Sequence, residues 1–420
     1  MSIQQETAVI RELCKKLAEL ASTPQNDIRR QRWADHNDRV RNDHTLLWVC
    51  PDDDGGWLEL IPPETLLCTD PDLRELEIRL RRYLYQAEHF PDDFVYEPCV
   101  YWNIPGDYTG YLYGAVDQTS AWGVPIHKPK VGKNAYHLDA FIKEEKDFEP
   151  MLRHEVDFIE DTAELERLRA KLEEAVGGLI AVRFQLPYSV LVQSHLIELV
   201  HLRGLDNLMY DLYDIPELLQ DVLHHMAVSK ARLLEKLECE HRLFDNRINI
   251  YTGSGSLGYT NAPRKADSDV RLEDMWGFAD AQEFSGVSAE MFESFAIENQ
   301  KIGLNLFGRA CYGCCEPLDD KYDAVFRHLP KVSRLSVSPW SNIELAAEKI
   351  GSKAIYSWKP NPALICTGFD DAEVEALLKR VRTATKDCFL EIILKDIRTC
   401  AHTPEHLAHF ITLVRNVFGE

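Results

Sequence analysis

Two adjacent thiols, a phenol and a carboxylate lie within one short stretch of the C-terminal half. The stretch is residues 304–326, LNLFGRACYGCCEPLDDKYDAVF, and it contains Cys311, Tyr312, Cys314, Cys315 and Glu316. A cysteine acts as a nucleophile or a metal ligand in its thiolate form, which nearby positive charge or a metal stabilises. Because a glycine and a proline flank Cys314 and place it in a turn, we predict a chemical role for it. Free cysteine is also among the most buried residue types, and we expect Cys311 and Cys315 in the core.

Further polar side chains follow other apolar runs of the sequence. Gln282 and Glu283 end one run, Lys359 and Asn361 end another, and Lys395 lies at the end of the last. Glu283 could act as a general base if burial raised its pKa, and the two lysines could hold a substrate anion. The alternatives are a salt-bridged carboxylate at the rim and lysines whose stems lie along apolar surface.

These side chains need strands to position them. Short runs rich in β-branched or aromatic residues predict eight strands, at 94–102, 178–186, 247–252, 277–284, 303–312, 334–339, 353–358 and 389–396. A helical pattern follows most of the runs, which predicts an α/β fold of the (β/α)8 TIM-barrel type. In that fold the functional residues lie where the strands end. A doubly wound sheet is the alternative, but it normally carries a glycine-rich loop after its first strand, whereas GSGSLG at 253–258 follows a middle one.

The remaining segments complete the expected organisation. Residues 1–45 are polar with a helical pattern and predict an N-terminal extension, and the barrel then covers residues 46–420. Residues 104–177 separate the first two predicted strands and include the aromatic-rich segment GDYTGYLYGAVDQTSAWGVP. We expect this part to be an insertion over the barrel mouth.

Composition limits the classes of partner. The formal charge of −22 at pH 7 argues against nucleic acid and against anionic membrane surfaces, which both attract an excess of Lys and Arg. No stretch approaches the roughly 18 uninterrupted apolar residues of a membrane span. Eleven scattered cysteines, an odd number, favour reduced thiols over a disulfide framework. We therefore expect a cytoplasmic protein.

Several segments resemble the uroporphyrinogen decarboxylase superfamily over roughly residues 180 to 420. They are HLRGLDNLMYDLYDIPELLQDVLHHM (201–226), DAQEFSGVSAEMFESF (280–295) and ACYGCCEPLDD (310–320), the last in the place of the family's HSCG segment. The resemblance implies a (β/α)8 barrel and one of two chemistries. One is cofactor-free decarboxylation, which relies on an N-terminal arginine motif that IRRQRWADHNDRVR at 28–41 does not match. The other is zinc-assisted methyl transfer with a corrinoid protein, as in the methylcobamide:coenzyme M methyltransferases.

The second chemistry implies a set of site residues. The family's zinc ligands are a His-x-Cys on the fifth strand and a later cysteine, so Cys314 takes the place of the first cysteine and Tyr312 stands where the histidine would be. Cys400 lies near the later cysteine, with His402 beside it, and Cys314, Cys400 and His402 are the implied metal ligands. The resemblance thus implies zinc, with one coordination position left open for a thiol substrate. The expected catalytic residues are Cys314, Tyr312 and Glu283, and the expected substrate-binding residues are Gln282, Lys359, Asn361 and Lys395.

The leading expectation is a methyltransferase that moves a methyl group between a small molecule and a corrinoid. The corrinoid would come from a separate protein, because the chain has no DxHxxG cobalamin-ligating motif. The alternatives are a cofactor-free decarboxylase of a carboxylated aromatic or tetrapyrrole-like substrate, and a non-catalytic barrel that binds a corrinoid or tetrapyrrole. A homodimer is also possible.

Overall fold

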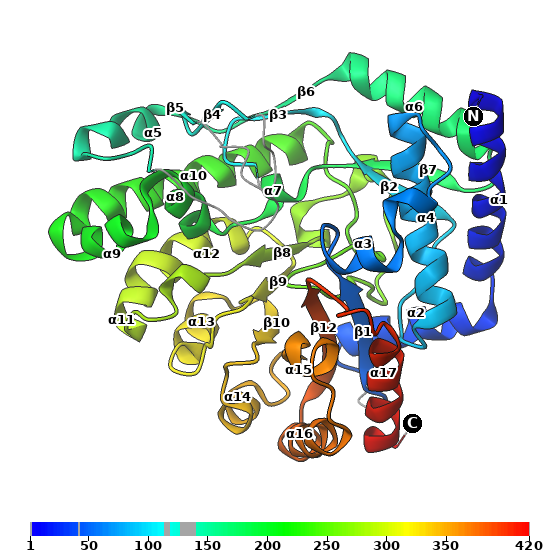
Figure 1. Cartoon of the computed structure of the whole chain (residues 1–420). Coiled ribbons are helices and arrows are strands. Elements are labelled where there is room, and N and C mark those ends of the chain that lie inside the picture. Colours follow the sequence, from blue (N-terminus) through cyan, green and yellow to red (C-terminus); the bar gives the residue numbers. More distant parts are fainter. Residues whose placement is uncertain (1, 41–42, 113–117, 127–139, 420) are drawn as a thin grey trace.

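Six parallel strands form the central sheet, in the order β1-β12-β11-β10-β9-β8 (Figure 1). The computed structural model describes residues 2–40, 43–112, 118–126 and 140–419. The strands are β1 (Leu46–Pro51), β8 (Trp276–Ala279), β9 (Arg309–Tyr312), β10 (Val332–Val337), β11 (Ile355–Trp358) and β12 (Phe389–Ile397). From β8 to β12, consecutive strands are neighbours in the sheet and a helix connects each pair. This is the parallel strand-helix alternation of an α/β fold.

The two faces of the sheet carry different side chains, because successive residues of a strand point to opposite faces. On β12, Leu390, Ile392 and Leu394 belong to the apolar core that the sheet shares with the surrounding helices. Glu391 points the other way, and its Oε1 lies 3.0 Å from Nε of Arg334 on β10. Since β11 separates β10 from β12 in the sheet, Arg334 and Glu391 meet across β11, on the concave face of the curled sheet.

A separate parallel pair, β2 (Cys99–Asn103) and β7 (Ala181–Gln185), lies between the two edges of the curled sheet. Two aspartates just before β2 join it to β1. Oδ2 of Asp93 accepts the backbone N–H of Leu47 at 2.9 Å, and Oδ2 of Asp92 accepts that of Val49 at 3.0 Å. We call this junction the β1 seam.

At the other edge of the sheet, β8 meets the irregular segment that follows α10 (Pro216–Cys239), and we call this junction the β8 seam. Nδ2 of Asn246 donates to the carbonyl of Trp276 at 2.8 Å, and the Trp276 backbone N–H donates to Oδ1 of Asn246 at 2.9 Å. One isolated bridge pairs Val192 with Phe278. Among the described residues, the strands of the expected barrel therefore form a curled six-stranded sheet and the separate β2–β7 pair, without a continuous ladder around a closed barrel.

One strand prediction was wrong, and one strand was missed. Residues 247–252 were expected to be a strand, but they are irregular, and strand β1 at 46–51 was not among the predicted ones. In the 247–252 region, asparagine side chains replace the backbone partners that a strand would need. Asn246 pairs with β8, and Nδ2 of Asn249 donates to the carbonyl of Val95 at 3.0 Å.

Helices cover the convex face of the sheet (Figure 1). Their starts follow local rules, since Asp70, Asp161, Asn342 and Asp370 each cap a helix by accepting backbone N–H groups of its first turn. The helices that connect or flank the strands are α3 (Gly56–Leu60), α4 (Pro71–His89), α6 (Thr162–Val176), α7 (Tyr188–Leu191), α8 (His195–Arg203), α9 (Leu205–Asp214), α10 (Pro216–Cys239), α11 (Ala289–Met291), α12 (Glu298–Leu304), α13 (Tyr322–His328), α14 (Ile343–Ile350), α15 (Pro362–Cys366), α16 (Asp371–Ala384) and α17 (Glu405–Phe418). None of the described helices is both long enough and apolar enough to cross a membrane.

The N-terminal segment contains α1 (Ile3–Ala21) and α2 (Pro24–Asn37). The end of α2 reaches the amino-terminal opening of the curled sheet. Nδ2 of Asn37 donates to the carbonyl of Leu257 at 2.9 Å, and the Asn37 carbonyl accepts from Nη1 of Arg309, the first residue of β9, at 2.9 Å. The helix end thus closes one opening of the sheet.

Part of the expected insertion lies on α8 and α10. It contains the antiparallel pair β3 (Gly106–Tyr108) and β6 (Phe158–Glu160), the short pair β4 (Ser120–Ala121) and β5 (Val124–Pro125), and α5 (Glu149–Arg153). Nε1 of Trp122 donates to Glu198 of α8 at 2.7 Å, and Glu198 also pairs with Lys230 of α10 at 2.6 Å. Residues 113–117 and 127–139 of the expected insertion lie outside the described residues.

Candidate active site

Cys314 and Lys395 come from strands that are not neighbours, and they meet at the carboxyl end of the sheet. Cys314 follows β9 and Lys395 belongs to β12, with β10 and β11 between them. Nζ of Lys395 lies 3.6 Å from Sγ of Cys314 and 3.1 Å from Oδ2 of Asp396. Sγ of Cys315 lies 3.5 Å from that of Cys314. The curl of the sheet thus places a cation beside a pair of thiols.

Two buried acidic residues fix the turn that carries Cys314. Glu316 accepts the backbone N–H of Cys314 at 2.9 Å with one oxygen and that of Ala281 at 3.0 Å with the other. This ties the loop after β9 to the loop after β8. Asp280 follows β8, its carboxylate is hydrogen bonded by Ser194 and Cys314, and burial raises its pKa. The position of the thiol is therefore set by both loops together.

The surroundings of Glu283 favour the protonated form of its carboxyl group. Burial raises the pKa of Glu283 to about 8, and the charge of Asp280 adds to the effect. Burial and the same neighbour also raise the pKa of Glu316 to about 8. Oε2 of Glu283 has no hydrogen-bond partner among the described residues. A protonated carboxyl with an unoccupied oxygen can act as a general acid.

The cation and the thiols differ in their acidity. Burial works against the charged form of Lys395, but Tyr251, Cys314 and Asp396 outweigh it and raise the pKa of the lysine. The hydrogen bond between the thiols raises the pKa of Cys314, with burial adding to it, and lowers that of Cys315. The site thus presents an ammonium group, and Cys315 is the more acidic of the two thiols.

Lys359 lies deeper inside the curled sheet than Lys395. It follows β11, is only 3% exposed, and donates to Oγ of Ser357 at 2.5 Å and to the carbonyl of Gly255 at 3.3 Å. Burial lowers the pKa of Lys359 to about 7. It belongs to the buried polar network around Glu391 and not to the rim of the site.

Three other predicted residues have local structural roles. The Tyr312 hydroxyl donates to Gln300 at 2.8 Å, and the Tyr312 ring meets Phe292 edge-on. Successive strand residues point to opposite faces, so Tyr312 points to the helices because Cys311 points into the curled sheet. Asn361 caps α15 by accepting a backbone N–H at 3.0 Å. The carbonyl of Gln282 closes a 3-10 turn.

Cys400 and His402 lie around a different carboxylate, Glu59. The Cys400 backbone N–H donates to Glu59 at 2.9 Å, and His402 and the loop backbone help to lower the pKa of that carboxylate against the effect of burial. Within the described ranges, no group of three or more His, Cys, Asp or Glu side chains is placed to hold one metal ion. Catalytic zinc takes about three protein ligands, so the residues as placed do not fit the expected zinc site.

A cavity of about 680 Å³ opens at the carboxyl ends of β1, β2 and β7, and we call it the mouth cavity. It adjoins the thiol site through Tyr251 and through Asp396, the ion-pair partner of Lys395. Its size suits a small organic molecule. Its lining combines aromatic rings with acidic and basic side chains, and includes Trp48, Trp57, Tyr83, Phe94, Asp52, Asp53, Asp54, Arg79, Arg82 and Arg398.

Two acidic residues of the site, Asp280 and Asp396, were not among the predicted site residues. Asp280 continues the inward-facing series that begins with Trp276 and Phe278, so the period of two along β8 could have revealed it. Asp396 has a left-handed backbone with φ +58°, which no sequence pattern indicated. Comparison with family models finds none that matches this chain, and comparison with curated proteins finds no match either.

Proposed function

We propose that the protein is a methyltransferase that moves a methyl group between a small molecule and a corrinoid carried by a separate protein. The observation that carries the proposal is the 3.6 Å contact between Cys314, the cysteine that resembles the family's, and the Lys395 ammonium at the carboxyl end of a curled parallel sheet. That end of the sheet is where barrel enzymes have their active sites. The proposal includes a (β/α)8 arrangement in which β2 and β7 are the second and third strands.

The residues of the site would support the transfer by managing charge and protons. When a methyl group leaves an oxygen or nitrogen atom of the donor for the corrinoid, the carbon–heteroatom bond breaks and the atom left behind takes up a proton. Glu283 holds such a proton at neutral pH, and Lys395 would stabilise negative charge on the leaving atom. Cys314 contacts the Lys395 ammonium and keeps it in position. No step of this proposal uses zinc.

Decarboxylation is a second candidate, which the pairing of an ammonium with a protonated carboxyl favours. Lys395 would hold the substrate carboxylate, carbon dioxide would leave, and the carbanion would take its proton from Glu283. The four aspartates that line the mouth cavity are each paired with Arg82, Arg398 or Lys395, so the lining carries no large positive excess for a polyanionic tetrapyrrole. A substrate with a single carboxylate would suit this cavity better.

The test is methyl transfer from methoxyaromatic and methylamine donors to a corrinoid protein, followed by the absorbance of the corrinoid. Lys395→Met should lower the rate by roughly 100-fold, the size of effect expected for a group that acts on the reacting atoms. Cys314→Ser should lower it by less, because Cys314 acts by positioning Lys395. The matched controls are Cys239→Ser and Lys386→Met, which change an exposed thiol and an exposed lysine and should leave the rate unchanged.

Two other outcomes would redirect the proposal. Carbon dioxide release from a carboxylated substrate without any corrinoid would establish the decarboxylase instead. Tight corrinoid binding without turnover of any donor, and with Cys314→Ser indistinguishable from the wild type, would establish a carrier.

A further inference from the structure

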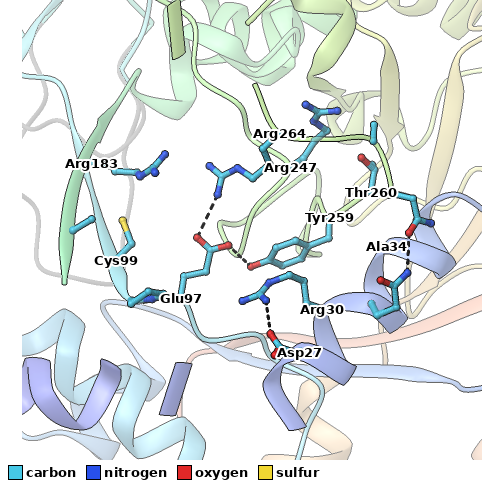
Figure 2. Close-up of a pocket in the computed structure, with 15 residues that line it drawn as sticks. Asp27, Arg30, Ala34, Glu97, Cys99, Arg183, Arg247, Tyr259, Thr260 and Arg264 are labelled. Carbon is cyan, nitrogen blue, oxygen red and sulfur yellow. Dashed lines mark hydrogen bonds and ion pairs between the residues drawn. The ribbon is translucent and has the colours of Figure 1, made fainter. Parts of the chain in front are cut away.

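A second cavity, of about 660 Å³, opens at the amino-terminal ends of β2 and β7, away from Cys314 and Cys315 (Figure 2). Its walls come from α2, from Cys99 and Ala181 at the start of the two strands, and from residues 259–262. The volume lies within the range of roughly 300–1,000 Å³ that is usual for small-molecule sites. We call it the arginine cavity.

The charge of this cavity is opposite to that of the chain as a whole. Acidic residues outnumber Lys and Arg by 69 to 47 in the sequence, yet the charged lining contains only two carboxylates and four guanidinium groups. A local excess of positive charge in a strongly acidic protein attracts small anions. The charged lining residues are Asp27, Glu97, Arg30, Arg183, Arg247 and Arg264.

Two of the arginines already have close partners. Arg247 donates to both oxygens of Asp245, at 2.8 and 2.6 Å, and Arg30 pairs with Asp27 at 2.7 Å. The charge of these two guanidinium groups is therefore neutralised. Arg247 and Arg30 form part of the wall, and the positive excess comes from Arg183 and Arg264.

Arg264 is held weakly. Its Nη1 lies 3.7 Å from Glu97, beyond hydrogen-bond distance. The two oxygens of Glu97 accept the hydroxyls of Tyr101 at 2.6 Å and Tyr259 at 2.7 Å. Because both oxygens are engaged, Glu97 satisfies the Arg264 guanidinium only in part.

Arg183 has no hydrogen bond or ion pair with any of the described residues, and it extends from β7 toward the cavity in Figure 2. Burial raises the pKa of the Cys99 thiol to about 12, and Arg183 and Arg264 both act against that shift. Both guanidinium groups line the arginine cavity. Two cations that line one cavity favour an anion between them.

We propose that the arginine cavity binds a phosphate monoester, with Arg183 and Arg264 as its main donors. A guanidinium fork matches the oxygens of a phosphate, and a phosphate concentrates close to two negative charges on one group. A dicarboxylate carries its two negative charges on two separate groups. The apolar part of the wall, formed by Ala34, Pro98, Ala181 and the ring of Tyr259, gives room for the organic part of the ester.

The test is calorimetric titration of the full chain with inorganic phosphate and with glycerol 1-phosphate at constant ionic strength. We expect one site per chain. Arg183→Gln and Arg264→Gln should each weaken binding roughly tenfold or more, the usual effect of losing hydrogen bonds from a charged group. Arg153→Gln is the matched control, because Arg153 is exposed and pairs with Glu149 on α5; it should change the affinity by less than about twofold.

Glu97→Gln provides a test in the opposite direction. It removes the negative charge that competes for Arg264, so phosphate should bind several-fold more tightly. Three results would overturn the proposal: no heat beyond that of a chloride titration, equal losses in Arg153→Gln and Arg183→Gln, or tighter binding of succinate than of either phosphate. The last would identify a dicarboxylate site.

Discussion

Glu391 is the carboxylate that neutralises the interior of the curled sheet. It is fully buried, and its Oε1 lies 3.0 Å from Nε of Arg334. Its Oε2 accepts the hydroxyl of Ser256 at 3.0 Å and lies 3.5 Å from His36, while Ser357 donates to Oε1. A substitution of Glu391 by Gln keeps the shape of the side chain and removes the charge, which leaves the buried Arg334 guanidinium without its counter-ion.

The expected loss of stability follows from two independent arguments. Burial raises the pKa of Glu391, but Arg334 and His36 outweigh it and lower the pKa from 4.5 to about 2. At about 1.4 kcal/mol per pH unit, this difference corresponds to about 3 kcal/mol of folding free energy. Removing one partner of a buried ion pair typically costs about 3–5 kcal/mol. We therefore expect Glu391→Gln to lower the free energy of unfolding by about 3–5 kcal/mol at neutral pH.

The pH dependence gives a second check. Because the folded-state pKa is lowered, the contribution of Glu391 is complete above the unfolded pKa of 4.5 and is lost as the pH falls through about 2. The variant lacks this contribution, so the stability gap between the two proteins should narrow on acidification. Urea unfolding followed by tryptophan fluorescence suits the measurement, since the Arg334 guanidinium lies 4.6 Å from the Trp276 ring centroid.

The control is Glu375→Gln, which removes an exposed carboxylate paired with Lys379 and should change stability by less than about 0.5 kcal/mol. Replacing both partners, as Arg334→Met with Glu391→Leu, should recover most of the loss because no unpaired charge remains buried. A Glu391→Gln variant within about 1 kcal/mol of the wild type, or a gap that stays constant on acidification, would refute the reasoning.

Three further predictions concern other groups. If Glu283 is the general acid, the rate should fall as the pH rises through about 8. Glu283→Gln should remove this fall from the pH–rate profile and lower the rate at neutral pH. An unchanged profile would exclude Glu283 from the proton transfer. Burial raises the pKa of Asp92 to about 7, so its contribution to stability is complete below pH 3.8 and is lost as the pH rises through about 7. Urea unfolding of Asp92→Asn should show no such decline in stability. A decline equal to that of the wild type would assign the pH dependence to another group. Protein purified without chelator should hold less than one zinc ion per chain by elemental analysis. One full equivalent of zinc that is lost in Cys314→Ser would contradict the placement of Cys400 and His402 beside Glu59.

The strand-helix alternation was readable from residue 277 onward, because each strand there packs an apolar face against its own helix. The segments at the two seams were harder to predict from the sequence. Residues 247–252 have β-branched and aromatic side chains, but the segment is irregular and Asn246 and Asn249 bond to its neighbours through their side chains. Strand propensity does not reveal such tertiary pairing. The Asp92 and Asp93 contacts to β1 were hidden for the same reason.

The candidate site was predictable to the extent that it depends on strand ends. Cys314 and Lys395 follow that rule and meet. Tyr312 does not face the cation, because inward and outward residues alternate from Cys311 onward. The loop with Cys400 and His402 depends on Glu59 and on a left-handed backbone at His402, φ +59°, neither of which its own residue pattern indicates.

The β2–β7 pair is a partition shared by two cavities. Cys99 and Arg183 line the arginine cavity, whereas Asn103 and Gln185, farther along the same strands, line the mouth cavity. Tyr101 stands between them, facing the mouth cavity while its hydroxyl bonds Glu97 of the other. A substitution on either strand can therefore change the walls of both cavities, and its effect on each ligand has to be measured separately.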